Sequence, residues 1–347
     1  MFNSKLKAKL VALFPEQFEE LARELETEKL HPLQEGLDAF AAGDHETARE
    51  KLEAAVAAEP YLTQAWVPLG LIYMHQGRYG EAEEHLFQAM CLDAENPKIH
   101  YHLGEVALGR KDAISAEYCF KKAIDLNPNY TDAYIKLGLT MLEEKRLEDA
   151  TKLFEKAVYL DRRAVVGHFY LAQISLQKQD FKRALVQLHL VKSLKPDYAP
   201  AYLMAADIFE RIRDFRQAFI ELKKAVSLGS ANGQVYLRLG KNQLVLKNRE
   251  NALAFFLEAK SADPSQWDAY YHAATIQEDM NHLEAALQNY EALLGNRKYF
   301  EIARMGVFRI RAVLDEVRQA MEGAPKPTHG VIKQFTGPLQ QPNRISA

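Results

Sequence analysis

A period of 34 residues runs through most of this 347-residue chain. Eight segments of that length follow one another without an insertion or deletion, and the twentieth residue of every segment is alanine. These alanines are Ala48, Ala82, Ala116, Ala150, Ala184, Ala218, Ala252 and Ala286. A single residue type at one position of eight consecutive segments indicates an array of structural repeats.

Two further positions of each repeat are complementary in size. The eighth residue is small in every repeat: Gly36, Gly70, Gly104, Gly138, Ala172, Ala206, Gly240 and Ala274. A bulky residue stands four positions after each recurring alanine: Leu52, Leu86, Phe120, Phe154, Leu188, Leu222, Phe256 and Tyr290. Two antiparallel helices need this arrangement where their backbones approach closely, because the small residue leaves a notch that the bulky side chain fills.

The pattern resembles the tetratricopeptide repeat, and the second repeat carries the whole signature: Trp66, Leu69, Gly70, Tyr73, Ala82 and Ala89. The resemblance implies an all-α fold, a right-handed superhelical solenoid of stacked antiparallel helix pairs. The eight repeats are expected at residues 29–62, 63–96, 97–130, 131–164, 165–198, 199–232, 233–266 and 267–300. The proline that closes a family repeat is present only as Pro60, Pro128, Pro196 and Pro264, which leaves the second-helix length open by a residue or two.

The flanks of the array have different patterns. Residues 1–28 include one apolar helical stripe, and residues 301–322 carry another, so we expect a capping helix at each end of the repeats. Seven proline and glycine residues fall within residues 323–347, which predicts a flexible tail.

Composition and charge exclude several classes of protein. A net charge of -3 gives no broad positive field for nucleic acid, and two cysteines provide no disulfide framework. The apolar run at Leu10–Phe14 is too short for a signal peptide, so we expect a cytoplasmic protein. Contact with a membrane is expected only if residues 2–14 act as a surface helix.

The resemblance implies that the first helix of each repeat lines a concave groove, with positions two, five, six, nine, twelve and thirteen facing inward. In the first five repeats these positions predict an apolar strip: Leu33, Leu37, Phe40, Val67, Leu71, Met74, Tyr101, Leu108, Ile135, Leu139, Leu142, Phe169 and Leu176. In the last three repeats they are charged, with Asp207, Glu210, Arg238 and Lys241. An apolar strip of this length needs a cover, which favours capture of an amphipathic helix or an extended peptide from a partner protein.

Two alternatives to this groove hypothesis stay open. Position five often holds an aromatic ring that only leans on the next repeat, and the charged residues also suit a solvated, unused wall. The chain could also be a self-assembling scaffold, if its own N-terminal helix or tail docks in a groove and gives a homo-oligomer.

The sequence predicts no catalytic, metal-binding or cofactor-binding site. The lysines and asparagines with which relatives bind chaperone C-termini, and the asparagine ladder of the sugar-transferase relatives, are absent from the corresponding positions. The eleven histidines lack ligand spacing, and no phosphate loop or nucleophile motif occurs. We therefore expect no catalytic residue, metal or cofactor, and a scaffold or adaptor as the function.

Overall fold

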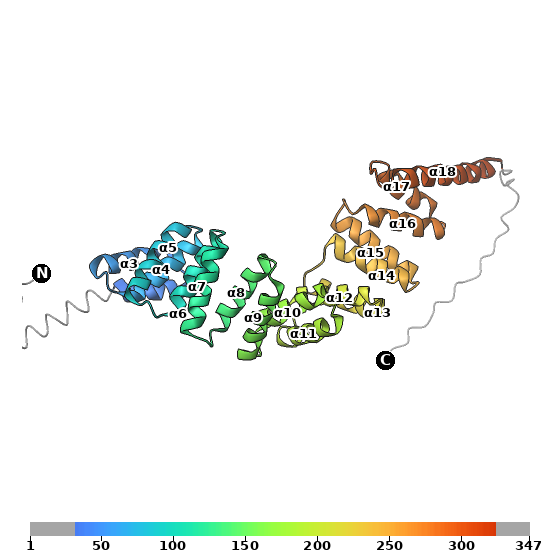
Figure 1. Ribbon diagram of the computed structural model, residues 1–347. Coiled ribbons are helices and arrows are strands. Elements are labelled where there is room, and N and C mark those ends of the chain that lie inside the picture. The colour runs from blue at the N-terminus through green and yellow to red at the C-terminus, as the bar shows by residue number, and fades with distance from the viewer. Residues whose placement is uncertain (1–31, 324–347) are drawn as a thin grey trace, which may run out of the picture. The chain divides into compact units, whose positions relative to one another are not determined.

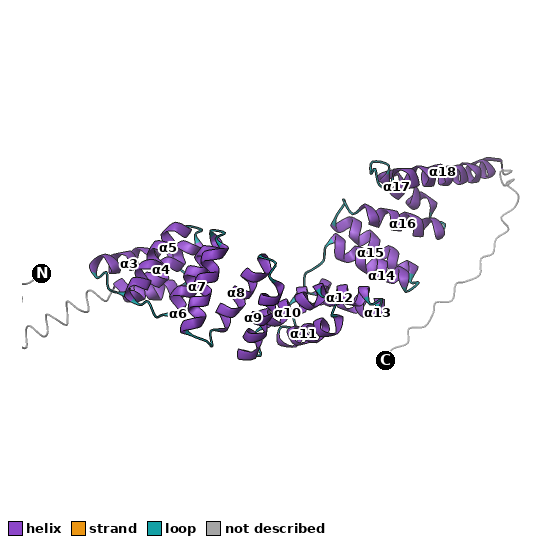
Figure 2. Ribbon diagram, in the orientation of Figure 1, coloured by secondary structure: helices purple, strands orange, loops and turns teal. Residues whose placement is uncertain are grey.

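The computed structural model describes residues 32–323, and these residues form helices joined by short loops, with no strand among them (Figures 1 and 2). The expected capping helix in residues 1–28 lies outside the described residues, and so does the expected tail at 323–347 except for Gly323, which is still helical. The helices form two compact parts, Met1–Ile208 and Phe209–Ala347. Each part is a run of antiparallel helix pairs, so the predicted all-α repeat fold is confirmed.

Each repeat contributes a first and a second helix. The first helices are residues 32–42, α4 Thr63–His75, α6 Pro97–Gly109, α8 Thr131–Glu143, α10 Val165–Gln177, α12 Ala199–Arg211, α14 Gly233–Val245 and α16 Trp267–Asp279. The second helices are α3 His45–Ala58, α5 Tyr79–Leu92, α7 Ala113–Leu126, α9 Leu147–Leu160, α11 Phe181–Leu194, α13 Phe215–Ser227, α15 Arg249–Ala262 and α17 Leu283–Leu293. A last helix, α18 Phe300–Gly323, lies in the range where a cap is expected.

Two of the four second helices that lack the closing proline keep the 14-residue length, whereas α13 has 13 residues and α17 has 11. Helices α5 and α9 have 14 residues without a following proline, the same as α7, which ends before Pro128. Helix α13 ends differently: Gly229 has a φ of +93°, and the amide of Ser230 donates to the carbonyl of Ala225. A left-handed residue that turns the chain back on the last helical carbonyls ends a helix as effectively as proline.

The complementary sizes inside each pair are confirmed. A Cβ placed on Gly138 would lie 2.9 Å from the Phe154 ring, and one on Gly70 would lie 2.6 Å from Leu86 Cγ. The recurring alanines are fully buried, as Ala82 and Ala150 show. The position requires a small residue, because a larger side chain would push the first helix away.

The turn between the two helices of a pair is the same in every repeat. The residue at position fifteen of the repeat lies in this turn and has a positive φ in all eight repeats: Gly43, Gly77, Lys111, Lys145, Gln179, Arg213, Lys247 and Asn281. The residue after it is the N-cap of the second helix, and at this position Asp44, Asp112, Asp180 and Asp214 accept a hydrogen bond from the amide three residues on. These aspartates satisfy an amide that has no partner within the helix.

Candidate functional site

The first helices carry the side chains that the sequence assigns to a groove. Residues at positions nine and twelve are half-buried in every repeat, as Leu71, Leu139 and Leu142 illustrate. They are half-buried because each first helix packs its opposite face against its own second helix, where Leu137 and Gly138 are buried. These two positions therefore form one face that solvent reaches in part.

We use the name apolar strip for the thirteen apolar residues from Leu33 to Leu176 that the sequence predicts. Leu33 is only 5% exposed and belongs to the core cluster around Ala48 and Leu52, so it offers the least surface. The other twelve are half-buried: Leu37, Phe40, Val67, Leu71, Met74, Tyr101, Leu108, Ile135, Leu139, Leu142, Phe169 and Leu176. Nine of these twelve pack with one flank against the core clusters.

Position five is occupied by side chains that lie between consecutive repeats. The ring of Tyr101 is 5.2 Å from that of Tyr130, and Phe169 meets Tyr198 edge-on at 5.2 Å. Burial raises the pKa of Tyr130 to about 12, which marks this contact as shielded from water. Each ring meets the last residue of its own repeat, directly before the next first helix, so one side of the ring is covered by the chain itself.

A polar cluster interrupts the apolar strip at the third repeat. The carboxylate of Glu105 lies 2.7 Å from Lys136 Nζ and 3.1 Å from His102 Nδ1, and the Tyr101 hydroxyl donates to it at 3.3 Å. Burial acts to raise the pKa of Glu105, but the hydrogen bonds from His102 and Lys136 outweigh it and lower this pKa to about 2. The sequence marks Glu105 as the polar exception in the strip, and the signal for its partners is that His102 and Lys136 occupy position six of consecutive repeats.

The charged residues predicted for the last repeats are bonded to one another in the C-terminal part. Arg238 donates to Glu210 through Nη2 at 2.8 Å and Nε at 3.0 Å, and Asn242 Nδ2 donates to the same carboxylate at 3.1 Å. Lys241 Nζ lies 3.2 Å from Asp268. The fourth predicted residue, Asp207, lies in the N-terminal part and is half-buried.

Asp268 also lines a hollow of about 340 Å³ in the C-terminal part. Lys298 Nζ lies 2.8 Å from its carboxylate, and the Tyr299 hydroxyl donates to it as well. Burial acts to raise the pKa of Asp268, but the hydrogen bonds from Lys298, Tyr299 and Lys241 hold this pKa well below its usual range. The carboxylate is thus saturated by groups of its own chain, and sequence reasoning did not identify this cluster.

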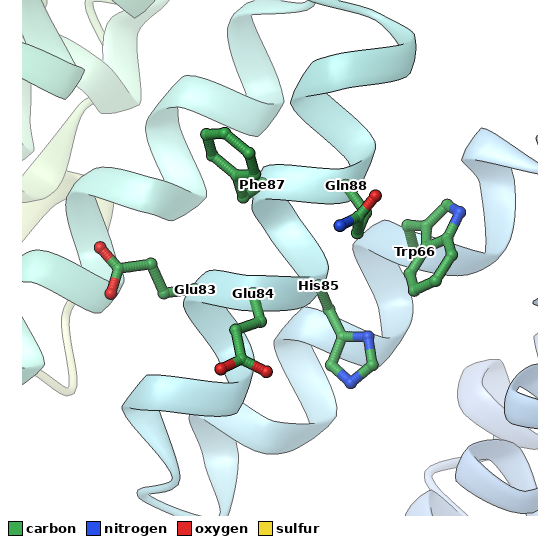
Figure 3. Close-up of a pocket in the computed structure, with 6 residues that line it drawn as sticks. All are labelled: Trp66, Glu83, Glu84, His85, Phe87 and Gln88. Atoms are coloured by element: carbon green, nitrogen blue, oxygen red, sulfur yellow. The ribbon is translucent and has the colours of Figure 1, made fainter. Parts of the chain in front are cut away.

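A second hollow, of about 570 Å³, lies in the second repeat and is lined by Trp66 and, from α5, by Glu83, Glu84, His85, Phe87 and Gln88 (Figure 3). The His85 ring stacks on Tyr73 at 4.9 Å and lies 5.6 Å from Trp66, whose indole NH donates to the carbonyl of Pro60 at 2.9 Å. Burial lowers the pKa of His85. The aromatic residues here pack on one another, so the hollow is a consequence of the repeat's own core packing.

The described residues give no sign of a metal centre or a bilayer-spanning segment. Within 32–319 no three histidine, cysteine, aspartate or glutamate side chains meet in a way that would hold a metal ion. Between residues 32 and 323 no helix has both the length and the apolar character needed to cross a membrane.

Comparison with known proteins identifies the repeats. Models of the tetratricopeptide repeat match residues 33–98 and 119–152. The chain is 24% identical over 232 residues to the TPR repeat-containing protein YpiA of Bacillus subtilis, which covers 66% of this chain and 54% of YpiA. It is 24% identical over 172 residues to anaphase-promoting complex subunit 3 of Schizosaccharomyces pombe, which covers 49% of this chain and 26% of that subunit.

A solved structure has the same fold. The tetratricopeptide repeat protein from Parabacteroides merdae matches 72% of this chain and 98% of its own with a TM-score of 0.51 at 19% identity. The chain spans about half or less of the length of the two curated relatives. The chain, whose antiparallel helix pairs share one 34-residue pattern, is thus a tetratricopeptide repeat protein.

Proposed function

We propose that the apolar strip of the N-terminal part holds an amphipathic helix or an extended segment of a partner protein. The observation that carries this proposal is the row of half-buried leucine, methionine and phenylalanine side chains at positions nine and twelve of the first five repeats. One flank of most of them is fixed in the core, so their exposed edges form a rigid surface and a ligand does not have to order them.

The available surface is sufficient for a measurable affinity. A ligand that buries four apolar anchors of about 100 Å² each would gain roughly 10 kcal/mol at about 25 cal/mol per Å². Association itself costs several kcal/mol, so we expect a dissociation constant in the micromolar range.

The Glu105 cluster defines one feature of this ligand. Covering Glu105 and Lys136 with an apolar side chain would remove water from two charged groups, which costs free energy unless the ligand replaces the lost hydrogen bonds. Lys136 is still about one third exposed. The segment should therefore place a polar or acidic side chain near Lys136, between apolar residues on both sides.

The paired charges of the C-terminal part should contribute less to binding than the apolar strip does. Glu210, Arg238 and Asn242 already satisfy one another, so a ligand would have to break good hydrogen bonds to use them. The proposal therefore rests on the N-terminal part. A role as one subunit of a larger protein assembly fits such a strip, and the fission-yeast relative, anaphase-promoting complex subunit 3, is itself a complex subunit.

The alternative is self-assembly, in which the chain's own residues 2–14 or 331–339 occupy the strip. It is favoured by the sequence, since Phe2, Leu6, Leu10 and Phe14 recur at helical spacing and would match an apolar surface. Light scattering before and after deletion of residues 1–15 tests the N-terminal form. A mass that does not change on deletion removes intermolecular docking of that segment.

Affinity capture from the native cell extract tests the proposal, with the unsubstituted chain and two variants compared side by side. The variant L71E/L139E places carboxylates on two half-buried positions of the strip, and V186E places one on an exposed site of α11 as the matched control. We expect at least one protein that the unsubstituted chain and V186E capture and L71E/L139E does not. Equal capture by all three, with unchanged helical circular dichroism, would refute this binding site.

A further inference from the structure

Helix α18 exposes large apolar side chains on the side that faces away from the rest of the C-terminal part. Phe308 is 80% exposed and Met305 62% exposed, whereas the exposed Ile302, Val313 and Val317 lie on another flank of the helix, about 120° or more around it from Phe308. The opposite side of the helix is buried, because Ala303, Val307 and Ile310 pack in one cluster with α17. A helix that served only to shield the last repeat would carry polar residues on its outer side.

The charged residues of α18 continue the same outer stripe. Glu301, Phe308 and Asp315 recur every seven residues, and Arg304, Arg311 and Arg318 recur with the same spacing three residues later. Residues seven apart lie two turns apart on one face of a helix. All six are outside the buried side of α18, and Arg304, Phe308, Arg311 and Asp315 line one shallow hollow of about 400 Å³.

We propose that this stripe is a homodimer interface, in which α18 packs antiparallel on α18 of a second copy of the chain. This inference goes beyond the proposed partner binding, which uses the N-terminal part. When Phe308 faces Arg311 of the second copy, Arg304 faces Asp315 of that copy and Glu301 faces its Arg318. Each contact occurs twice about the two-fold axis, as an isologous interface requires.

The order of charges selects the antiparallel arrangement. A parallel pair in register would place each arginine beside the same arginine of the second copy, which is repulsive. Within one chain Arg304 pairs with Glu301 and Arg311 with Glu291 on the protein surface. The antiparallel pair gives every arginine of the stripe a further partner, a carboxylate or the ring of Phe308 of the second copy, and arginine stacks favourably on an aromatic face.

Helix α18 is also long enough to form a specific dimer interface. Helix α18 has 24 residues and so extends over about 36 Å. Two such helices packed along most of that length bury on the order of 1,000 Å² in total, which is close to the lower bound for a specific interface. The exposed ring of Phe308 lies near the middle of this contact, beside the charge pairs.

Light scattering of the full chain at tens of micromolar concentration tests the oligomeric state, and we expect twice the mass of one chain. The variant M305E/F308E should weaken dimerisation by about 100-fold or more and give a monomer. The control I114E changes a side chain of equal exposure on α7 and should leave the dimer intact. A monomeric unsubstituted chain, whether its own tail or another protein covers α18, or a dimer that survives M305E/F308E, would overturn the proposal.

Two charge reversals test the pairing itself. R304D places an aspartate opposite Asp315 of the second copy, and D315R places an arginine opposite its Arg304, so each variant alone should dimerise at least about tenfold more weakly. An equimolar mixture of the two should regain the dimer, because both contacts then join opposite charges. A mixture that stays as weak as the single variants contradicts the antiparallel pairing. The capture experiment with L71E/L139E is independent of this result, so either idea can fail alone.

Discussion

Gly104 lies directly against the ring of Phe120, and a Cβ on Gly104 would be 2.6 Å from Phe120 Cε1. The same relationship joins Gly240 and Phe256, where the corresponding distance is also 2.6 Å. In the fifth repeat the two positions hold Ala172 and Leu188, both fully buried. The chain thus makes one contact with several combinations, glycine with phenylalanine or leucine and alanine with leucine or tyrosine, and each fills the space between a first and a second helix.

The substitution G104A should therefore lower the free energy of unfolding by about 1–3 kcal/mol, because an added methyl group in a packed core forces side chains or backbone to move. The double variant G104A/F120L reproduces the pair found in the fifth repeat and should recover part of the loss. Thermal and urea unfolding followed by helical circular dichroism measure both effects.

Gly80 provides the matched control for this substitution. It lies in α5 and has open space where a Cβ would stand. G80A should leave stability unchanged or raise it by about 0.5–1 kcal/mol, since alanine loses less backbone entropy on folding. If G80A and G104A destabilise equally, the contact with Phe120 is not the cause.

In the positive-φ turn, a substitution is expected to raise the free energy of unfolding, in contrast to G104A. Lys145 has a φ of 62° at the position where the second repeat has Gly77 with a φ of 73°. A left-handed backbone costs a non-glycine residue roughly 1–2 kcal/mol. K145G should raise the free energy of unfolding by up to about 1 kcal/mol, measured by urea unfolding.

The control for K145G is K152G in α9, where the backbone is helical. Glycine in a helix interior is about 1 kcal/mol less favourable than alanine, so K152G should destabilise the chain. Loss of stability in both variants would show that the turn at Lys145 carries no strain.

The fold was predictable from the sequence because one structural requirement is repeated eight times. Ala82 and its equivalents identify the contact between the two helices of a pair, and Gly70 and Leu86 identify its other side. The left-handed turn was not predictable, since five of its eight residues are lysine, arginine or glutamine, which do not signal a positive φ. Repeat geometry imposes that conformation on whatever residue falls at the fifteenth position.

The candidate site was predictable only as a set of positions. The sequence places Leu71 and Leu139 on one face, but how far each is buried depends on the neighbouring repeat, as the low exposure of Leu33 shows. Charge pairing was not predictable, because Glu105 with Lys136 and Glu210 with Arg238 are about 30 residues apart in the chain. Such pairs form only after consecutive first helices lie side by side.

The two cysteines should differ in reactivity. Cys91 is exposed, whereas Cys119 is half-buried and burial raises the pKa of its thiol. Because the thiolate is the reactive form, a thiol reagent such as a disulfide dye should modify Cys91 rapidly and Cys119 slowly at pH 8. The variant C91S should retain only the slow phase and C119S only the fast one. Equal rates for the two cysteines would contradict the burial of Cys119.

The Glu105 cluster should make stability depend on pH in the acid range. The pKa of Glu105 is about 2 in the folded chain, below the roughly 4.3 of an unfolded glutamate, so its ionised form is stabilised by folding. This contribution is fully present above about pH 4.3 and is lost as the pH falls towards 2. E105Q should lower the free energy of unfolding by about 1–2 kcal/mol at neutral pH, and the difference from the unsubstituted chain should shrink below pH ~4.3. Urea unfolding at several pH values measures this difference, with E95Q in an exposed turn as the matched control. A difference for E105Q that stays constant down to pH ~2 would contradict the pairing of Glu105 with Lys136 and His102.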